Sequence, residues 1–348
     1  MKKIIRNIAW YSYYLYDRVK CLPSKNSVKE IDNKLATLLA NEIDEKKFEK
    51  VIIFATYEKE LSDEYIKYFL PMVDHSLTVI INNTIKHEFG VESKDGSVIW
   101  VNRPNFGRDI ASYKLGVRSV LRSQRNHIKD LTLINDSLYI LKSKFFDFFT
   151  IEFSDDVLAH SYSTLPRPHA RSYLIRLKPK VLDSLDAYLE TIPFAKSRYN
   201  AVINGEIGMN KNVLLQYKIG LWAYSGIFKE ISSREEIRDL DVYSSAYISN
   251  KYMPKATKTL EKDIKEKVFI DNFLRDPYEL SSTSSMFQPN VIKREVYEKG
   301  LASKEKVFSA IENSELPDSA KKELLKQILI SKRHFGIKNR LKLAIGEI

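Results

Sequence analysis

The sequence predicts an α/β fold in which a largely parallel sheet is flanked by helices and followed by a helical C-terminal extension. First, short apolar runs of strand length alternate with segments of helical periodicity over roughly the first half of the chain. Second, these runs end in polar residues rather than in tight hairpin turns. Third, the composition beyond about residue 255 becomes charged and helical. The strands are predicted at residues 51–55, 77–81, 98–101, 131–134, 172–177 and 221–224.

Helices are predicted between and after these strands, because parallel neighbours need crossover connections. The apolar spacing of residues 29–43 favours a helix, and Pro71 is expected to end the one at 61–70. Pro104 and Gly107 end the third strand, and a helix follows them. Further helices are predicted at 181–189, from Asn204 onward, at 304–311 and at 319–330, the last two separated by Leu316-Pro317.

Composition excludes several classes of protein. A hydrophobic fraction of 44% is too high for a disordered chain of 348 residues, and the single cysteine, Cys21, excludes a disulfide framework or a multi-cysteine metal site. The net charge of +11 is compatible with nucleic acid, anionic lipid or a polyanionic substrate. Zinc-finger spacing and RNA-recognition signatures are absent. Basic residues are scattered through the middle of the chain and recur at both ends, which favours an anionic membrane surface over nucleic acid.

Both ends of the chain combine basic and apolar residues. Residues 1–20 either form an interfacial helix on an anionic membrane or pack on the main domain, and residues 332–348 have the same character. No segment is apolar over a length that spans a bilayer. We therefore expect a cytoplasmic protein, peripheral at the inner face of the plasma membrane. Its predicted parts are an N-terminal helical segment (1–48), a catalytic domain (49–254) and a helical extension (255–348).

Polar residues follow the predicted strands and indicate a ligand site. Open α/β sheets bind ligands beyond the carboxyl ends of their strands. Signatures of dinucleotide binding, the P-loop, zincin metalloproteases and α/β-hydrolases are absent. The polar ends are Thr56-Tyr57, Asn82-Asn83, Asn102 and Asn135-Asp136-Ser137.

Five short segments carry a resemblance to a known family. They read NFGRD at 105–109, INDS at 134–137, RSYL at 171–174, EIG at 206–208 and PNVIKREV at 289–296. In this order and spread the chain resembles glycosyltransferases of the GT-A type. More narrowly, it resembles the rhamnan synthesis protein F family of bacterial polysaccharide glycosyltransferases.

The resemblance implies an enzyme that transfers a sugar, L-rhamnose from dTDP-rhamnose, to a lipid-linked acceptor glycan of a growing surface polysaccharide. An alternative is a UDP-sugar donor used for a capsule or an O-antigen. A second alternative, from a different class, is a non-catalytic scaffold with this fold in a polysaccharide assembly complex. A nucleic-acid binder is the third alternative.

The chemistry of sugar transfer assigns roles to individual residues. Negative charge grows on the departing diphosphate, and GT-A enzymes hold Mg²⁺ or Mn²⁺ there with a D-x-D motif. Here that position reads Asn135-Asp136-Ser137, with one carboxylate. Asp136 is thus the predicted catalytic and metal residue. Arg103, Arg108 or Lys114 would supply the positive charge if no metal binds.

Glu206 is the predicted general base, since an inverting transferase needs a carboxylate to accept the proton of the acceptor hydroxyl. The alternative is a first-turn glutamate that favours the helix dipole. Asp109 either bonds the ribose or base of the donor or favours the dipole of its own helix. His169, Arg171 and Ser172 are predicted on the acceptor side. The predicted donor-binding residues are Thr56, Tyr57, Asn82, Arg103, Asn105, Gly107, Arg108, Asp109, Lys114, Asn135 and Ser137.

Overall fold

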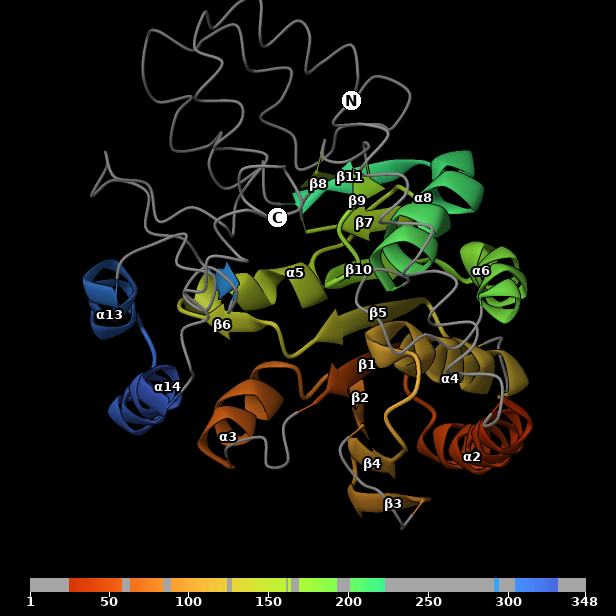
Figure 1. The fold of residues 1–348 in the computed structure, drawn as a ribbon, viewed down its shortest axis with the longest axis horizontal. Helices are drawn as coiled ribbons and strands as arrows, with labels where there is room; N and C mark the ends of the chain where they lie inside the picture. The colour runs from red at the N-terminus through yellow and green to blue at the C-terminus, as the bar shows by residue number, and fades with distance from the viewer. Residues whose placement is uncertain are drawn as a thin grey trace, which may run out of the picture.

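The protein is built around one mostly parallel eight-stranded sheet with helices on both faces (Figure 1). This confirms the predicted α/β class. The computed structural model describes residues 25–57, 63–83, 89–123, 127–160, 162–163, 169–192, 201–222, 291–293 and 304–330.

The strand order is β11-β7-β10-β5-β1-β2-β4-β3. The central pairs β5–β1, β1–β2 and β2–β4 are parallel, as expected, and so is β7–β11. The edge strand β3 and the inserted strand β10 pair antiparallel with their neighbours. The bounds are Lys50–Thr56 (β1), Leu77–Asn82 (β2), Gly90–Asp95 (β3), Val98–Asn102 (β4), Asp130–Asn135 (β5), Val157–Ala159 (β7), Leu174–Leu177 (β10) and Ile219–Leu221 (β11).

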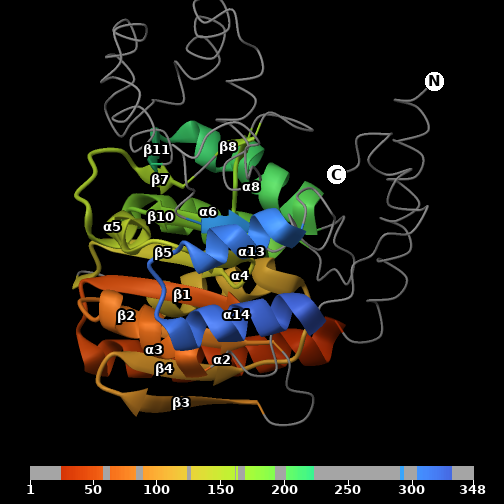
Figure 2. The ribbon, with the colours of Figure 1, turned by 90° about the vertical axis from the view of Figure 1, so that its left-hand side faces the viewer.

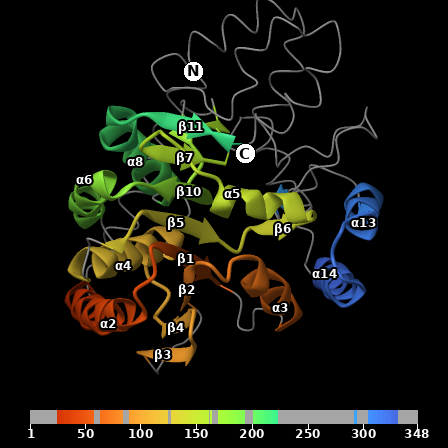
Figure 3. The ribbon, with the colours of Figure 1, turned by 180° about the vertical axis from the view of Figure 1, so that it is seen from behind.

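The helices form two layers, which Figure 3 shows from behind. One layer holds α2, α4, α6 and α8, and the other holds α3, η3 and α5. Pro71 lies in the last turn of α3, which ends one residue later. The bounds are Lys25–Lys46 (α2), Asp63–Met72 (α3), Arg108–Arg122 (α4), Ser143–Phe146 (η3), Asp147–Thr150 (α5), Pro179–Thr191 (α6) and Gly208–Asn212 (α8).

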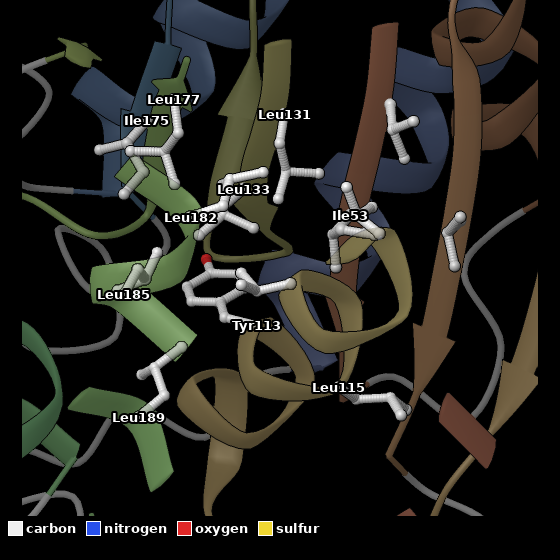
Figure 4. Packing of buried hydrophobic residues seen from close by; sticks show 14 of the residues in the cluster. Ile53, Tyr113, Leu115, Leu131, Leu133, Ile175, Leu177, Leu182, Leu185 and Leu189 are labelled. Atoms are coloured by element: carbon white, nitrogen blue, oxygen red, sulfur yellow. The ribbon is translucent and has the colours of Figure 1, made fainter. Parts of the chain in front are cut away.

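Strand β1 explains why both faces of the sheet are covered. Val51, Ile53 and Ala55 face the cluster under α2, α4 and α6, whereas Ile52 and Phe54 face the phenylalanine-rich cluster under α3 and α5. A parallel strand that is buried on both faces is a continuous apolar run, which is the pattern in the sequence. Figure 4 shows the first cluster, in which Tyr113 of α4 lies among leucines of β5 and α6.

The C-terminal helices α13 (Lys304–Glu312) and α14 (Asp318–Ile330) confirm the two predicted amphipathic segments. They share a third cluster with strands β6 (Leu138–Ile140) and β12 (Val291–Lys293), which pair antiparallel. In Figure 2 both helices lie in front of the sheet, and α14 contacts α3.

Helix α2 belongs to the same core as the sheet, since Leu35, Leu39 and Ile43 are part of the first cluster. The predicted interfacial segments at 1–20 and 332–348, and Cys21, lie outside the described residues. Among the helices that are described, none has the length and apolarity needed to cross a membrane.

Gly116 lets α4 pack closely on β1. A Cβ at this position would lie 2.6 Å from Cγ1 of Ile53. Alanine normally favours a helix over glycine by about 1 kcal/mol, but overpacking a core costs about 1–3 kcal/mol. We expect Gly116→Ala to lower the free energy of unfolding by about 1–2 kcal/mol in urea denaturation. Gly96→Ala is the control, because nothing lies within 4 Å of its added Cβ. Equal stability of both variants would contradict this packing.

Candidate active site

The candidate site lies where the direction of strand addition reverses. The chain builds β1, β2 and β4 outward to one side and then returns to place β5 on the other side of β1. Ligands of open α/β sheets bind at such a switch point, outside the carboxyl ends of the strands. Here these ends carry Thr56 and Tyr57 from β1 and Asn135 and Asp136 from β5.

Asp136 joins the ends of β1 and β5. Its Oδ2 accepts hydrogen bonds from Thr56 Oγ1 at 3.0 Å and from the Tyr57 backbone N–H at 2.7 Å. Asp136 is buried, so these two donors compensate part of the cost of removing its carboxylate from water. The predicted residues Thr56, Tyr57 and Asp136 therefore lie together.

Asn135 joins β5 to the first turn of α4. Its Nδ2 donates to Asp109 Oδ2 at 2.9 Å, and its Oδ1 accepts from the Ser137 N–H at 3.1 Å. Gly107 and Arg108 precede Asp109 with positive φ angles of 82° and 55°. This left-handed turn, which suits Gly107 better than a side-chain-bearing residue, turns the loop into α4 and sets the position of Asp109.

Glu206 reaches the same place from a different part of the chain. It lies in a π-helix, η4 (Ala201–Ile207), so the helical segment begins before the predicted start at Asn204. A Cβ on the preceding Gly205 would lie 2.4 Å from Cγ1 of Ile110, so the glycine permits close approach to α4. Glu206 Oε1 accepts from the Ser172 N–H at 3.0 Å and lies 3.8 Å from His169 Nε2. About 18% of its side chain is exposed.

The strand segment that carries His169 is held by a residue that the sequence analysis did not single out. The Asn210 side chain accepts from the Ala170 N–H and donates to the Ala170 carbonyl, at 2.8 and 2.7 Å. Its Nδ2 also donates to the Glu206 carbonyl. Asn210 thereby fixes His169, Ser172 and Glu206 relative to one another. Arg171 is buried beside them. The burial of His160 is the main cause that lowers its pKa to about 3, and the positive charge of Arg171 is the second cause.

Asp109 and Glu206 influence each other electrostatically. Burial first, and then the negative charge of Glu206, raises the pKa of Asp109, although hydrogen bonds from Asn135 and Ile110 oppose the change. Two carboxylates in one site cannot both ionise without cost. As the pH rises, the unfolded chain releases the Asp109 proton first. The folded protein keeps this proton up to a higher pH, because its Asp109 has the raised pKa.

This gives a pH dependence. The unfolded chain loses the Asp109 proton near its ordinary pKa, so stability falls as the pH rises from about 3.8 to the raised pKa of the folded state. We expect melting temperatures measured between pH 4 and 8 to fall less with rising pH in Asp109→Asn than in the wild type, because asparagine does not titrate. Each unit of pKa shift corresponds to about 1.4 kcal/mol. The exposed Asp318→Asn serves as control. Parallel curves for Asp109→Asn and the wild type would contradict the raised pKa.

The Tyr57 hydroxyl is a candidate contact for a polar ligand atom. It is buried and has no hydrogen-bond partner within the described residues. Burial, followed by the charge of Asp109, raises the pKa of Tyr57, so the hydroxyl stays protonated. A buried hydroxyl without a partner costs free energy, which a polar ligand atom would recover. The hydroxyl of Tyr113 is likewise buried and unpartnered in the described structure, but it lies among leucines.

Arg103 does not match its predicted donor-binding role. Its side chain is fully buried and forms a bidentate pair with Asp32 of α2, at 2.8 and 2.9 Å. Its Nη1 donates to Asn83 Oδ1 and to the carbonyls of Pro104 and Phe106. The guanidinium thus fixes the loop that leads to Gly107, and we correct its role to a structural one.

Lys114 also faces away from the site. It lies 3.4 Å from Glu190 of α6, in a polar seam where Arg118 pairs with Asp186 and Glu190. Burial first, and then Arg118, lowers the pKa of Lys114 to about 8. Its predicted donor-binding role is therefore replaced by one in helix packing. Among the other predicted donor residues, Asn82 is buried in register between Thr56 and Asn102, and Asn105 is exposed in the loop.

The side chains at the site limit how a metal ion could bind. Across the described ranges no three His, Cys, Asp or Glu side chains gather to hold one. Asp136 supplies a carboxylate whose Oδ2 already accepts two hydrogen bonds. Mg²⁺ often binds through one or two carboxylates together with phosphate and water. The predicted Mg²⁺ or Mn²⁺ therefore fits here only as the companion of a bound diphosphate.

Comparison with known proteins finds no matching family model and no matching curated protein. The fold and the geometry of the site therefore carry the functional proposal.

Proposed function

We propose that the protein is a glycosyltransferase with a GT-A-like fold that moves a sugar from a nucleoside diphosphate donor to a glycan hydroxyl. One observation carries the proposal: Asp136, Asp109 and the partly exposed Glu206 meet at the switch point of the sheet. The Tyr57 hydroxyl, which has no hydrogen-bond partner in the part of the chain that the structure describes, supports a polar ligand at this position. The mostly parallel sheet with helices on both faces is compatible with this fold.

In the proposed reaction the acceptor hydroxyl oxygen attacks the anomeric carbon from the face opposite the diphosphate. As the new C–O bond forms, the bond from the anomeric carbon to the phosphate oxygen breaks, and its electron pair leaves with the nucleoside diphosphate. Glu206 accepts the hydroxyl proton. The Ser172 N–H bond at 3.0 Å orients the carboxylate for this role. If Mg²⁺ or Mn²⁺ takes part, Asp136 would hold it, and the ion would neutralise charge on the diphosphate.

L-rhamnose from dTDP-rhamnose is the proposed donor, with a UDP-sugar as the alternative. The motif resemblance supports the first choice. A lipid-linked glycan is the proposed acceptor. The net charge of +11 supports binding of the protein to the anionic inner face of the plasma membrane.

The test is a thermal-shift panel of dTDP-rhamnose and UDP-sugars, with and without Mg²⁺ or Mn²⁺, followed by an assay for released nucleoside diphosphate. A donor at a hundred times its Kd is expected to stabilise the fold by about 2.7 kcal/mol. Stabilisation by none of these donors would overturn the proposal. Binding without turnover on any lipid-linked acceptor would favour the non-catalytic scaffold.

A further inference from the structure

Strand β12 brings a lysine to the candidate site from far downstream in the sequence. Lys293 pairs with Leu138 of β6, directly after the Asn135-Asp136-Ser137 strand end. The blue strand beside β6 in Figure 1 is this segment. The two residues before Lys293, Val291 and Ile292, are buried, which anchors the strand.

The ammonium group of Lys293 has a defined position. Its Nζ lies 4.7 Å from the centroid of the Tyr173 ring, a cation–π contact. Tyr173 is itself held, because its carbonyl accepts from the Asn135 N–H and its hydroxyl lies 3.2 Å from His160 Nδ1. Lys293 is also close enough to Asp109 for its charge to lower the pKa of that carboxyl.

The carboxylates of the site require a positively charged group nearby if a diphosphate is to bind. Asp136 and Glu206 would repel a diphosphate. Arg103 and Lys114, two of the cations predicted from the sequence to neutralise the diphosphate, form ion pairs with carboxylates of helices α2 and α6. Lys293 lies next to the strand end, and its side chain is only partly buried.

We propose that Lys293 binds the diphosphate of the nucleotide donor, with Tyr173 as the platform that holds its ammonium group in place. This assignment rests on the proposed function and names the residue that takes the charge of the leaving group. Preorganised cations stabilise negative charge that develops on a departing phosphate. The recognised chemistry is a pair of linked phosphates, whichever nucleoside or sugar they carry.

The test is calorimetric titration of the full-length protein with dTDP, UDP and inorganic pyrophosphate. Lys293→Met retains the aliphatic stem against Tyr173 and removes the charge. It is expected to weaken dTDP or UDP binding about tenfold to a hundredfold, whereas Lys293→Arg retains most of the affinity.

Lys178→Met is the matched control. Lys178 also lies over an aromatic ring, 4.1 Å from the centroid of Phe153, but it follows Leu177, which pairs with Leu131 near the opposite end of β5. Its substitution changes the net charge equally and is expected to leave binding unchanged.

The outcomes separate the two proposals. Wild-type affinity in a folded Lys293→Met protein, or an equal loss in Lys178→Met, overturns the role of Lys293 and leaves the proposed function standing. Pyrophosphate binding that depends on Lys293, without binding of either nucleotide, supports the phosphate site and contradicts the proposed function. Absence of binding by all three probes to the wild type overturns both.

Discussion

Replacing Glu206 with glutamine is expected to reduce sugar transfer by about a hundredfold to ten-thousandfold while leaving the fold intact. The amide has nearly the shape of the carboxylate and can still accept the Ser172 N–H bond through its oxygen. It cannot accept the proton of the acceptor hydroxyl. The measurement is kcat and KM for release of nucleoside diphosphate with acceptor present, together with donor affinity by calorimetry.

Donor affinity distinguishes a base from a binding residue. We expect the Kd for the donor to change little in Glu206→Gln, because the lost interaction belongs to the transition state. Glu312→Gln, on the exposed surface of α13, is the control for removing one carboxylate. If donor affinity fell as far as turnover, Glu206 would be a binding or structural residue.

Replacing Arg103 with methionine is expected to destabilise the fold by about 3–5 kcal/mol, because it leaves Asp32 as a buried charge without its partner. The carbonyls of Pro104 and Phe106 lose a donor in the same step. Adding Asp32→Leu to Arg103→Met should recover part of the loss, since it removes the uncompensated charge. Urea denaturation measures all three proteins.

Arg176→Met is the matched comparison. Arg176 is equally buried and forms the same bidentate pair with Asp130, at the first residue of β5 and away from the candidate site. Both variants should lose similar stability. A stable Arg103→Met protein that no longer binds dTDP or UDP would restore the ligand-binding role predicted from the sequence.

The sequence by itself determined the elements whose apolar pattern is strong. The runs that became β1, β2 and β5 are buried on both faces and therefore predominantly apolar, and α4 has a one-sided helical pattern after Gly107. The polar residues at the ends of these strands were also readable, because a parallel sheet brings the carboxyl ends of neighbouring strands to one edge. Thr56, Asn135 and Asp136 were found in this way.

Weak local patterns were missed. The short strands β3 and β7 were not predicted, since Gly90–Asp95 is a largely polar edge strand and Val157–Ala159 is only three residues long. The antiparallel insertion of β10 between β5 and β7 also escaped prediction. Pairing direction is a property of two strands together, and neither strand alone encodes it.

Only the tertiary structure decided which charged residues belong to the site. Arg103 and Lys114 were adjacent in sequence to the predicted pocket, yet each faces a carboxylate on a packed helix, because a buried cation needs a partner of opposite charge. Lys293 was distant in sequence, yet the pairing of β12 with β6 carries it to the end of β5. Local patterns specify the elements and their buried faces, whereas the partner of each buried charge is set by how those elements pack.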